Sequence, residues 1–170
     1  TGLTNILIFF LQESLNWTTK ASSGTLVVVG IIAIIVQGVL IGPLVKQFGE
    51  MRLTLIGSGF ILVACTLLIT TPKENATINI YSAVSFLAIG AGLITPTLRA
   101  LISKKLDVDK QGSILSNLQG LQSLGGVLGI AMAGRVYDSF GPKSPFIAGS
   151  VILLFICLLY TSPSPRDGLL

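Results

Sequence analysis

Long apolar runs joined by short polar connections make up most of the chain. The clearest pair runs from Ser22 to Val45 and from Leu53 to Thr70, on either side of a polar, glycine-rich segment at residues 42–52. A helix of about 20 apolar residues crosses the hydrocarbon of a bilayer. Apolar segments cover residues 1–13 (a partial one), 22–45, 53–71, 80–102, 113–134 and 146–160. None alternates polar and apolar positions as a barrel strand does, so the pattern predicts transmembrane helices.

Composition supports the same class of protein. Hydrophobic residues make up 51% of the chain and charged residues 11%, whereas soluble domains carry about 25% charged residues. A water-exposed surface cannot be built from so few charges, which indicates an integral membrane protein in contact with the lipid bilayer. The net charge of +4 is typical of lysines and arginines gathered in cytoplasmic loops, so no nucleic-acid partner is predicted.

The residue types needed for metal binding or catalysis are scarce. The chain has no histidine, and both cysteines, Cys65 and Cys157, lie inside apolar segments. We therefore predict no disulfide, no metal site and no cofactor. Neither an HExxH motif nor a pair of acidic residues lies within the predicted spans, so an enzyme embedded in the membrane is not predicted.

Basic residues predict the orientation. With the segment at 42–52 on the cytoplasmic side, the inner ends carry six basic residues and the outer ends four, as the positive-inside rule requires. The inner set is Lys46, Arg52, Arg99, Lys104, Lys105 and Lys110, and the outer set is Lys20, Lys73, Arg135 and Lys143.

The segment at 42–52 resembles the signature cytoplasmic loop of the major facilitator superfamily of secondary transporters, approximately Gly-x-Leu-Ala-Asp-Arg-x-Gly-Arg-Arg. It matches at Gly42, Leu44 and Gly49. It departs at Lys46 and Gln47, which replace the Asp-Arg pair, and at Glu50 and Met51, which replace the closing basic pair, with Arg52 one place beyond. A weakened loop of this kind is usual in the second half of these proteins.

The resemblance implies a six-helix half of a twelve-helix fold, covering helices seven to twelve with the first and last truncated. Gly90-Ala-Gly92, Pro96 and Arg99 suit helix ten. The run from Gln119 to Gly129 resembles helix eleven of drug/proton antiporters related to tetracycline efflux proteins. We expect residues 1–156 to form this C-terminal transmembrane half, with the N-terminal half of the same protein missing.

The last residues break the apolar pattern. Residues 157–167 contain two prolines and a charge pair, and they resemble the translation of a sequencing adapter. We expect residues 157–170 to be a non-native read-through tail. The alternative is a genuine short cytoplasmic tail.

Polar residues on the predicted helix eleven gather on one side. At 100° per residue, the polar side collects small and amide residues, namely Ser116, Gln119, Gln122, Ser123 and Gly126, while Leu121, Leu124 and Leu128 lie opposite. Polar groups facing lipid are costly, so we predict that this side lines the substrate cavity. Thr95 and Gln37 are further candidates. The alternative is interhelical hydrogen bonding.

Two other sets of residues are candidates for function. A stripe on the predicted helix ten holds Gly92, Pro96 and Arg99, where the glycine and proline permit a kink. In the loop, the resemblance implies a gate latch made by Gly42, Lys46, Gly49 and Arg52; the alternative is a turn that merely obeys the positive-inside rule. Small residues four apart, such as Gly125 and Gly129 or Gly38 and Gly42, predict close helix packing.

The resemblance implies transport of a small molecule by alternating access, as proton-coupled efflux of a drug or metabolite. No acidic residue lies well inside a complete span, so the group that binds the proton is expected in the missing half or at Glu13. A solute importer or uniporter, or a non-transporting sensor on the same scaffold, stays open. The bacterial inner membrane is the expected location.

Overall fold

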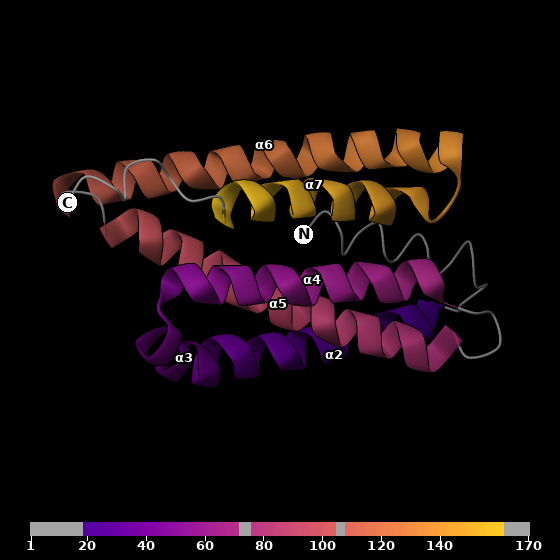
Figure 1. The fold of residues 1–170 in the computed structure, drawn as a ribbon, viewed down its shortest axis with the longest axis horizontal. Coiled ribbons are helices and arrows are strands. Elements are labelled where there is room, and N and C mark those ends of the chain that lie inside the picture. The colour runs from indigo at the N-terminus through magenta and orange to yellow at the C-terminus, as the bar shows by residue number, and fades with distance from the viewer. Residues whose placement is uncertain (1–18, 72–75, 105–107, 162–170) are drawn as a thin grey trace.

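The computed structural model describes residues 19–71, 76–104 and 108–161, and nearly all of them are helical. The elements are α2 (Thr19–Ile35), η1 (Val36–Leu40), α3 (Ile41–Phe48), α4 (Glu50–Thr70), α5 (Ala76–Lys104), α6 (Val108–Phe140) and α7 (Ser144–Thr161) (Figure 1). No strand occurs in these three ranges. The all-α prediction is confirmed; the predicted partial segment at 1–13 lies outside the described residues.

Three of the predicted spans are long and apolar enough to cross a membrane. They are Ser23–Phe48, Glu50–Thr70 and Thr77–Lys104, and a shorter apolar helix covers Ser144–Leu158. The predicted apolar segment at 113–134 lies within the 33-residue helix α6. The three membrane-capable helices of the described ranges do not include α6, which carries many polar side chains and glycines.

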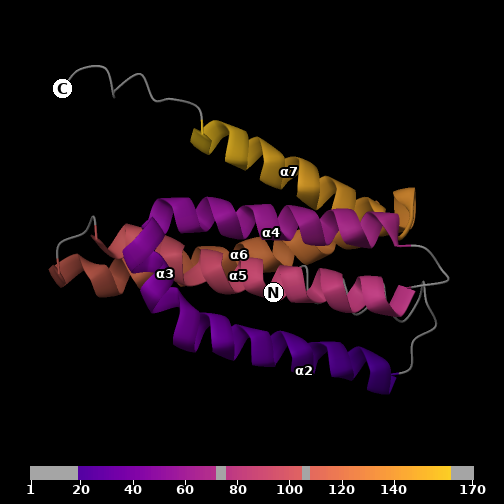
Figure 2. The same ribbon diagram turned by 60° about the horizontal axis from the view of Figure 1, so that its bottom comes forward.

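The helix pair α4 and α5 forms the centre of the structure. The two helices share the most extensive contact, with α7 packed on α4 and α2 on α5 (Figure 2). They approach most closely where two glycines face each other. A methyl group added at Gly90 would lie 2.6 Å from the carbonyl oxygen of Gly57, and one added at Gly57 would lie 2.9 Å from Cγ1 of Ile94. Only residues without a side chain allow this spacing.

The small-residue stripes predicted to pack closely do not do so within the described structure. A methyl group at Gly38, Gly42, Gly125 or Gly129 would meet nothing within 4 Å. A four-residue interval between small residues shows only that a helix has a smooth stripe. It does not show that another helix lies on that stripe.

Apolar side chains fill the space on either side of the α4–α5 contact. One buried cluster joins α4, α5 and α7, and its members are Ala64, Leu68, Ile80, Ala83, Val84, Leu87 and Phe146. A smaller cluster of Val36, Leu53 and Leu93 joins η1 to the same pair. In a membrane such clusters stabilise helix association by van der Waals packing, and through them the α4–α5 pair also holds α2 and α7.

The predicted polar hinge at 42–52 is almost entirely helical. Only Gly49 interrupts the helices, with φ at 75°, and its amide N–H donates to the carbonyl of Val45 at 2.9 Å. Glycine suits this left-handed backbone because it has no Cβ. Gly42, by contrast, lies inside α3. Pro43 follows the π-helical turn η1, a local widening that accommodates a residue without an N–H.

Connections alternate between the two ends of the bundle. The α3–α4 turn, the end of α5 and the start of α6 lie at one end, and the α6–α7 connection lies at the other (Figure 1). At that other end, Lys143 Nζ donates to the carbonyl of Ile69 at 2.6 Å, where the C-terminus of α4 attracts a cation. This arrangement places Lys46, Arg52 and Lys104 at one end, which is the end that the sequence predicts to be cytoplasmic.

Replacing Gly90 by alanine is expected to destabilise the chain by about 1–3 kcal/mol, because the new methyl group meets backbone atoms that cannot move aside. The matched control is Gly59→Ala in α4, where a methyl group would meet nothing within 4 Å. The midpoint of thermal unfolding in detergent micelles measures both. Equal midpoints for the two variants would show that the glycine contact does not hold α4 and α5 together.

Candidate functional site

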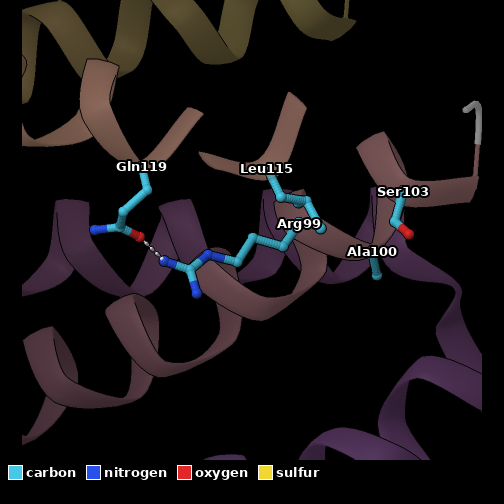
Figure 3. Close-up of a pocket in the computed structure, with 5 residues that line it drawn as sticks. All are labelled: Arg99, Ala100, Ser103, Leu115 and Gln119. Carbon is cyan, nitrogen blue, oxygen red and sulfur yellow. Dashed lines mark hydrogen bonds between the residues drawn. The ribbon is translucent and has the colours of Figure 1, made fainter. Parts of the chain in front are cut away.

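The structure brings two of the predicted groups together between α5 and α6. The guanidinium of Arg99, on α5, donates from Nη2 to Oε1 of Gln119 on α6 (Figure 3). The same nitrogen lies 3.5 Å from Oε1 of Gln122. Arg99 was predicted as part of a stripe on one helix and the two glutamines as a polar side of another. The contact between them was not predicted.

Helix geometry explains how one arginine reaches both amides. Gln119 and Gln122 are three residues apart and therefore lie on the same side of α6. The guanidinium carries five N–H donors and no acceptor, so both amides turn their oxygens toward it. All three side chains are exposed in this chain.

A cavity of about 300 Å³ adjoins this contact (Figure 3). It is lined by Arg99, Ala100, Ser103, Leu115 and Gln119. Near Ser103, the side-chain amide of Gln111 donates to the Ser103 carbonyl at 3.1 Å, which ties the start of α6 to the end of α5. The cavity thus combines one cation and one amide with apolar walls, as small-molecule sites do.

The serines on the polar side of α6 have partners within their own helix. Ser116 Oγ donates to the carbonyl of Gly112 at 2.9 Å, and Ser123 Oγ donates to the carbonyl of Gln119 at 3.0 Å. Both hydroxyls keep acceptor lone pairs, so a ligand would meet them as acceptors. Their role in lining a cavity stays a prediction.

Gly92 lies on the same side of α5 as Arg99, about two turns earlier along the helix. A methyl group at Gly92 would lie 3.1 Å from Cγ1 of Val36 and 3.9 Å from Nε2 of Gln37, so this part of the predicted stripe packs against η1. Gln37 is exposed and Thr95 is half-buried. Pro96 lies within the continuous helix α5. The structure therefore separates Gln37 and Gly92 from the Arg99 cluster.

At the end of the bundle that holds the α3–α4 turn, the ion pair is not made by the predicted latch cations. Lys46 and Arg52 are exposed, and in the described part of the chain the ion pair at this end joins Glu50 to Lys104. Glu50 is the first residue of α4, where the helix dipole favours a carboxylate, and Lys104 is the last residue of α5, where it favours a cation.

A buried hydrogen bond supports the same pair of helix ends. Oγ1 of Thr54 lies 3.0 Å from Oγ1 of Thr97, about one turn from Glu50 on α4 and about two turns from Lys104 on α5. Sequence reasoning noted Glu50 only as a departure from the loop pattern. The sequence does show an acidic residue at the start of one predicted helix and a basic residue at the end of another. Predicting that the two residues pair requires the relative positions of α4 and α5 along their axes, which the sequence does not show.

Over the three described ranges, no group of three or more His, Cys, Asp or Glu side chains is placed to hold a metal ion. The side chains of the Arg99 cluster offer hydrogen bonds and one positive charge for the recognition of a ligand.

Replacing Glu50 or Lys104 by glutamine is expected to loosen the adjoining ends of α4 and α5, because one charge of the pair then lacks its partner. Amide hydrogen exchange in the first turns of α4 should become severalfold faster. The double variant Glu50→Lys with Lys104→Glu should restore protection from hydrogen exchange only in part, because each swapped charge opposes the dipole of its helix. Lys46→Gln is the control, and an equal increase in exchange there would contradict a specific role for the pair.

Comparison with known proteins agrees with this architecture. The family model described as Major Facilitator Superfamily matches residues 1–169. Two similar proteins are tetracycline resistance proteins: class H of Pasteurella multocida, 27% identical over 78% of this chain and 32% of its own length, and class D of Salmonella ordonez, 26% identical over 94% and 41%. The human Hippocampus abundant transcript 1 protein is 23% identical over 82% and 28%.

The chain thus spans between 28% and 41% of the length of these curated relatives. No solved structure gives a significant match. The family model covers nearly the whole chain, and the helical, membrane-capable fold agrees with it. The chain belongs to the major facilitator superfamily.

Proposed function

We propose that this chain is the C-terminal half of a transporter that exports a drug or other small organic molecule in exchange for protons, by alternating access. The observation that carries the proposal is the Arg99–Gln119–Gln122 cluster beside a cavity of about 300 Å³. Ionisable and amide side chains at membrane depth belong next to a water-filled path or a partner helix.

The environment of α6 supports a cavity-lining role for that helix. It packs on α7 and touches α5 only sparsely, which leaves most of its side chains from Gly112 to Arg135 exposed. Its apolar side, with Leu121, Leu124 and Leu128, suits lipid or another helix. Its amide side suits an aqueous path. In the proposal, the N-terminal half of the carrier forms the opposite wall of that path.

The proposed direction of transport is based on the relatives of this chain, and so is its proposed coupling to protons. Two of the similar proteins are named for tetracycline resistance, which supports efflux, and both are bacterial, which supports the inner membrane as the location. Within the three membrane-capable helices Glu50 is the only acidic residue, and it forms an ion pair with Lys104. The carboxylate that takes up the coupling proton is therefore proposed to lie elsewhere in the complete carrier, with Glu13 as the candidate within this chain.

The test is Gln122→Leu in a complete carrier containing this chain. Everted membrane vesicles report proton exchange when tetracycline is added as the first probe. Loss of one amide contact should lower transport by roughly 3- to 30-fold, which corresponds to 0.6–2 kcal/mol, at unchanged abundance in the membrane.

Asn117→Leu provides the matched control, since it also replaces an exposed amide of α6 by leucine but on the apolar side of the helix. Unchanged transport in Gln122→Leu, or the same loss in both variants, would count against a cavity-lining role. Uptake into cells rather than efflux would favour the importer, and binding without flux would favour a sensor.

A further inference from the structure

Arg99 forms no ion pair within the described part of the chain. Its partners are the side-chain oxygens of Gln119 and Gln122, which are uncharged. The ion pair found in the described ranges joins Glu50 to Lys104 instead. Arg99 lies within the membrane-capable helix Thr77–Lys104, where an unpaired charge is costly unless it faces water or meets an anion.

The guanidinium also has donors to spare. Both glutamine contacts use the same nitrogen, Nη2. Figure 3 shows this nitrogen directed at Gln119, with the other terminal nitrogen turned away from the amide. The planar fork of a guanidinium matches the two oxygens of a carboxylate, and bonds between charged partners are roughly twice as strong as neutral ones. A carboxylate therefore outcompetes the glutamine oxygens for this site.

We propose that Arg99 binds the carboxylate of the transported molecule, so that the carrier selects small organic acids. This inference rests on the proposed transport function and names its substrate class. Ala100 and Leu115 provide apolar walls beside the guanidinium in a cavity of about 300 Å³, which suits a monocarboxylate with a compact apolar body.

Binding there has a consequence for α6. Besides its packing on α7, α6 is joined to α5 by the Arg99 contacts and by the Gln111–Ser103 hydrogen bond. A carboxylate that takes the guanidinium from Gln119 and Gln122 removes part of this connection. Substrate binding thereby frees the middle of α6 to move relative to α5.

The experiment uses the complete purified carrier in detergent, with benzoate as the probe and benzamide as its uncharged counterpart, at constant ionic strength. Benzoate in about tenfold excess over its Kd should raise the midpoint of thermal unfolding by about 1–2 °C, and benzamide should not. Arg99→Gln should abolish the shift. Arg99→Lys should keep only part of it, because lysine retains the charge but lacks the fork.

Arg135→Gln is the matched control, since Arg135 is also exposed and lies toward the far end of α6; it should keep the full benzoate shift.

A benzoate effect that is absent from the unmodified carrier, or matched by benzamide, would overturn the inference. The inference would also be overturned if benzoate had no effect on the unfolding midpoint of the carrier while Arg99→Gln lowered that midpoint. In that case the partner of Arg99 would be a carboxylate of the protein itself. If the protein binds benzoate but transports no solute, the proposed transport function is wrong and the binding site at Arg99 stands. If the protein transports charged and uncharged solutes equally well, this inference is wrong and the proposed transport function stands.

Discussion

The close approach of α4 and α5 at Gly57 and Gly90 is the constraint on which the rest of the structure depends. With backbone atoms nearly in contact there, neither helix can slide along the other without a clash. The same relative position brings Thr54 to Thr97 and Glu50 to Lys104. The pair also provides the surfaces on which α2 and α7 pack. In a membrane, where lipid is as apolar as the side chains, such tight packing supplies much of the association between helices.

This rigid pair contrasts with α6. Its attachment to α5 consists of a few polar contacts, and its longer contact is with α7. A helix held by a few exchangeable hydrogen bonds moves more readily than a pair fixed by backbone contact. The Arg99 cluster lies at the boundary between the fixed part and the loosely held part. In the proposed mechanism, this position links ligand binding at the cavity to movement of α6 relative to α5.

The sequence predicts the helices well and the contacts between them poorly. The spans around 22–45, 53–71 and 80–102 were predictable because only a membrane accommodates such long apolar runs. The hinge at 42–52 was placed too broadly, since its polar residues are compatible with helix and only Gly49 needs a left-handed backbone. Gly57 and Gly90 were not singled out as a contact because, in sequence, they look like the glycines at 38 and 125. The pairing of Glu50 with Lys104 and of Arg99 with Gln119 depends on how far each helix is shifted along its neighbour, and residue periodicity does not contain that information.

The most direct test of the account is a cysteine accessibility scan along residues 117–128 of α6, made in the complete carrier with Cys65 and Cys157 replaced by alanine. A membrane-impermeant thiol reagent would label each position in native vesicles. The account predicts fast labelling at 119, 122, 123 and 126 and slow labelling at 121, 124 and 128, because only the amide side of the helix faces water. Fast labelling on the leucine side, or uniform protection throughout, would contradict the claim that α6 and Arg99 border an aqueous path.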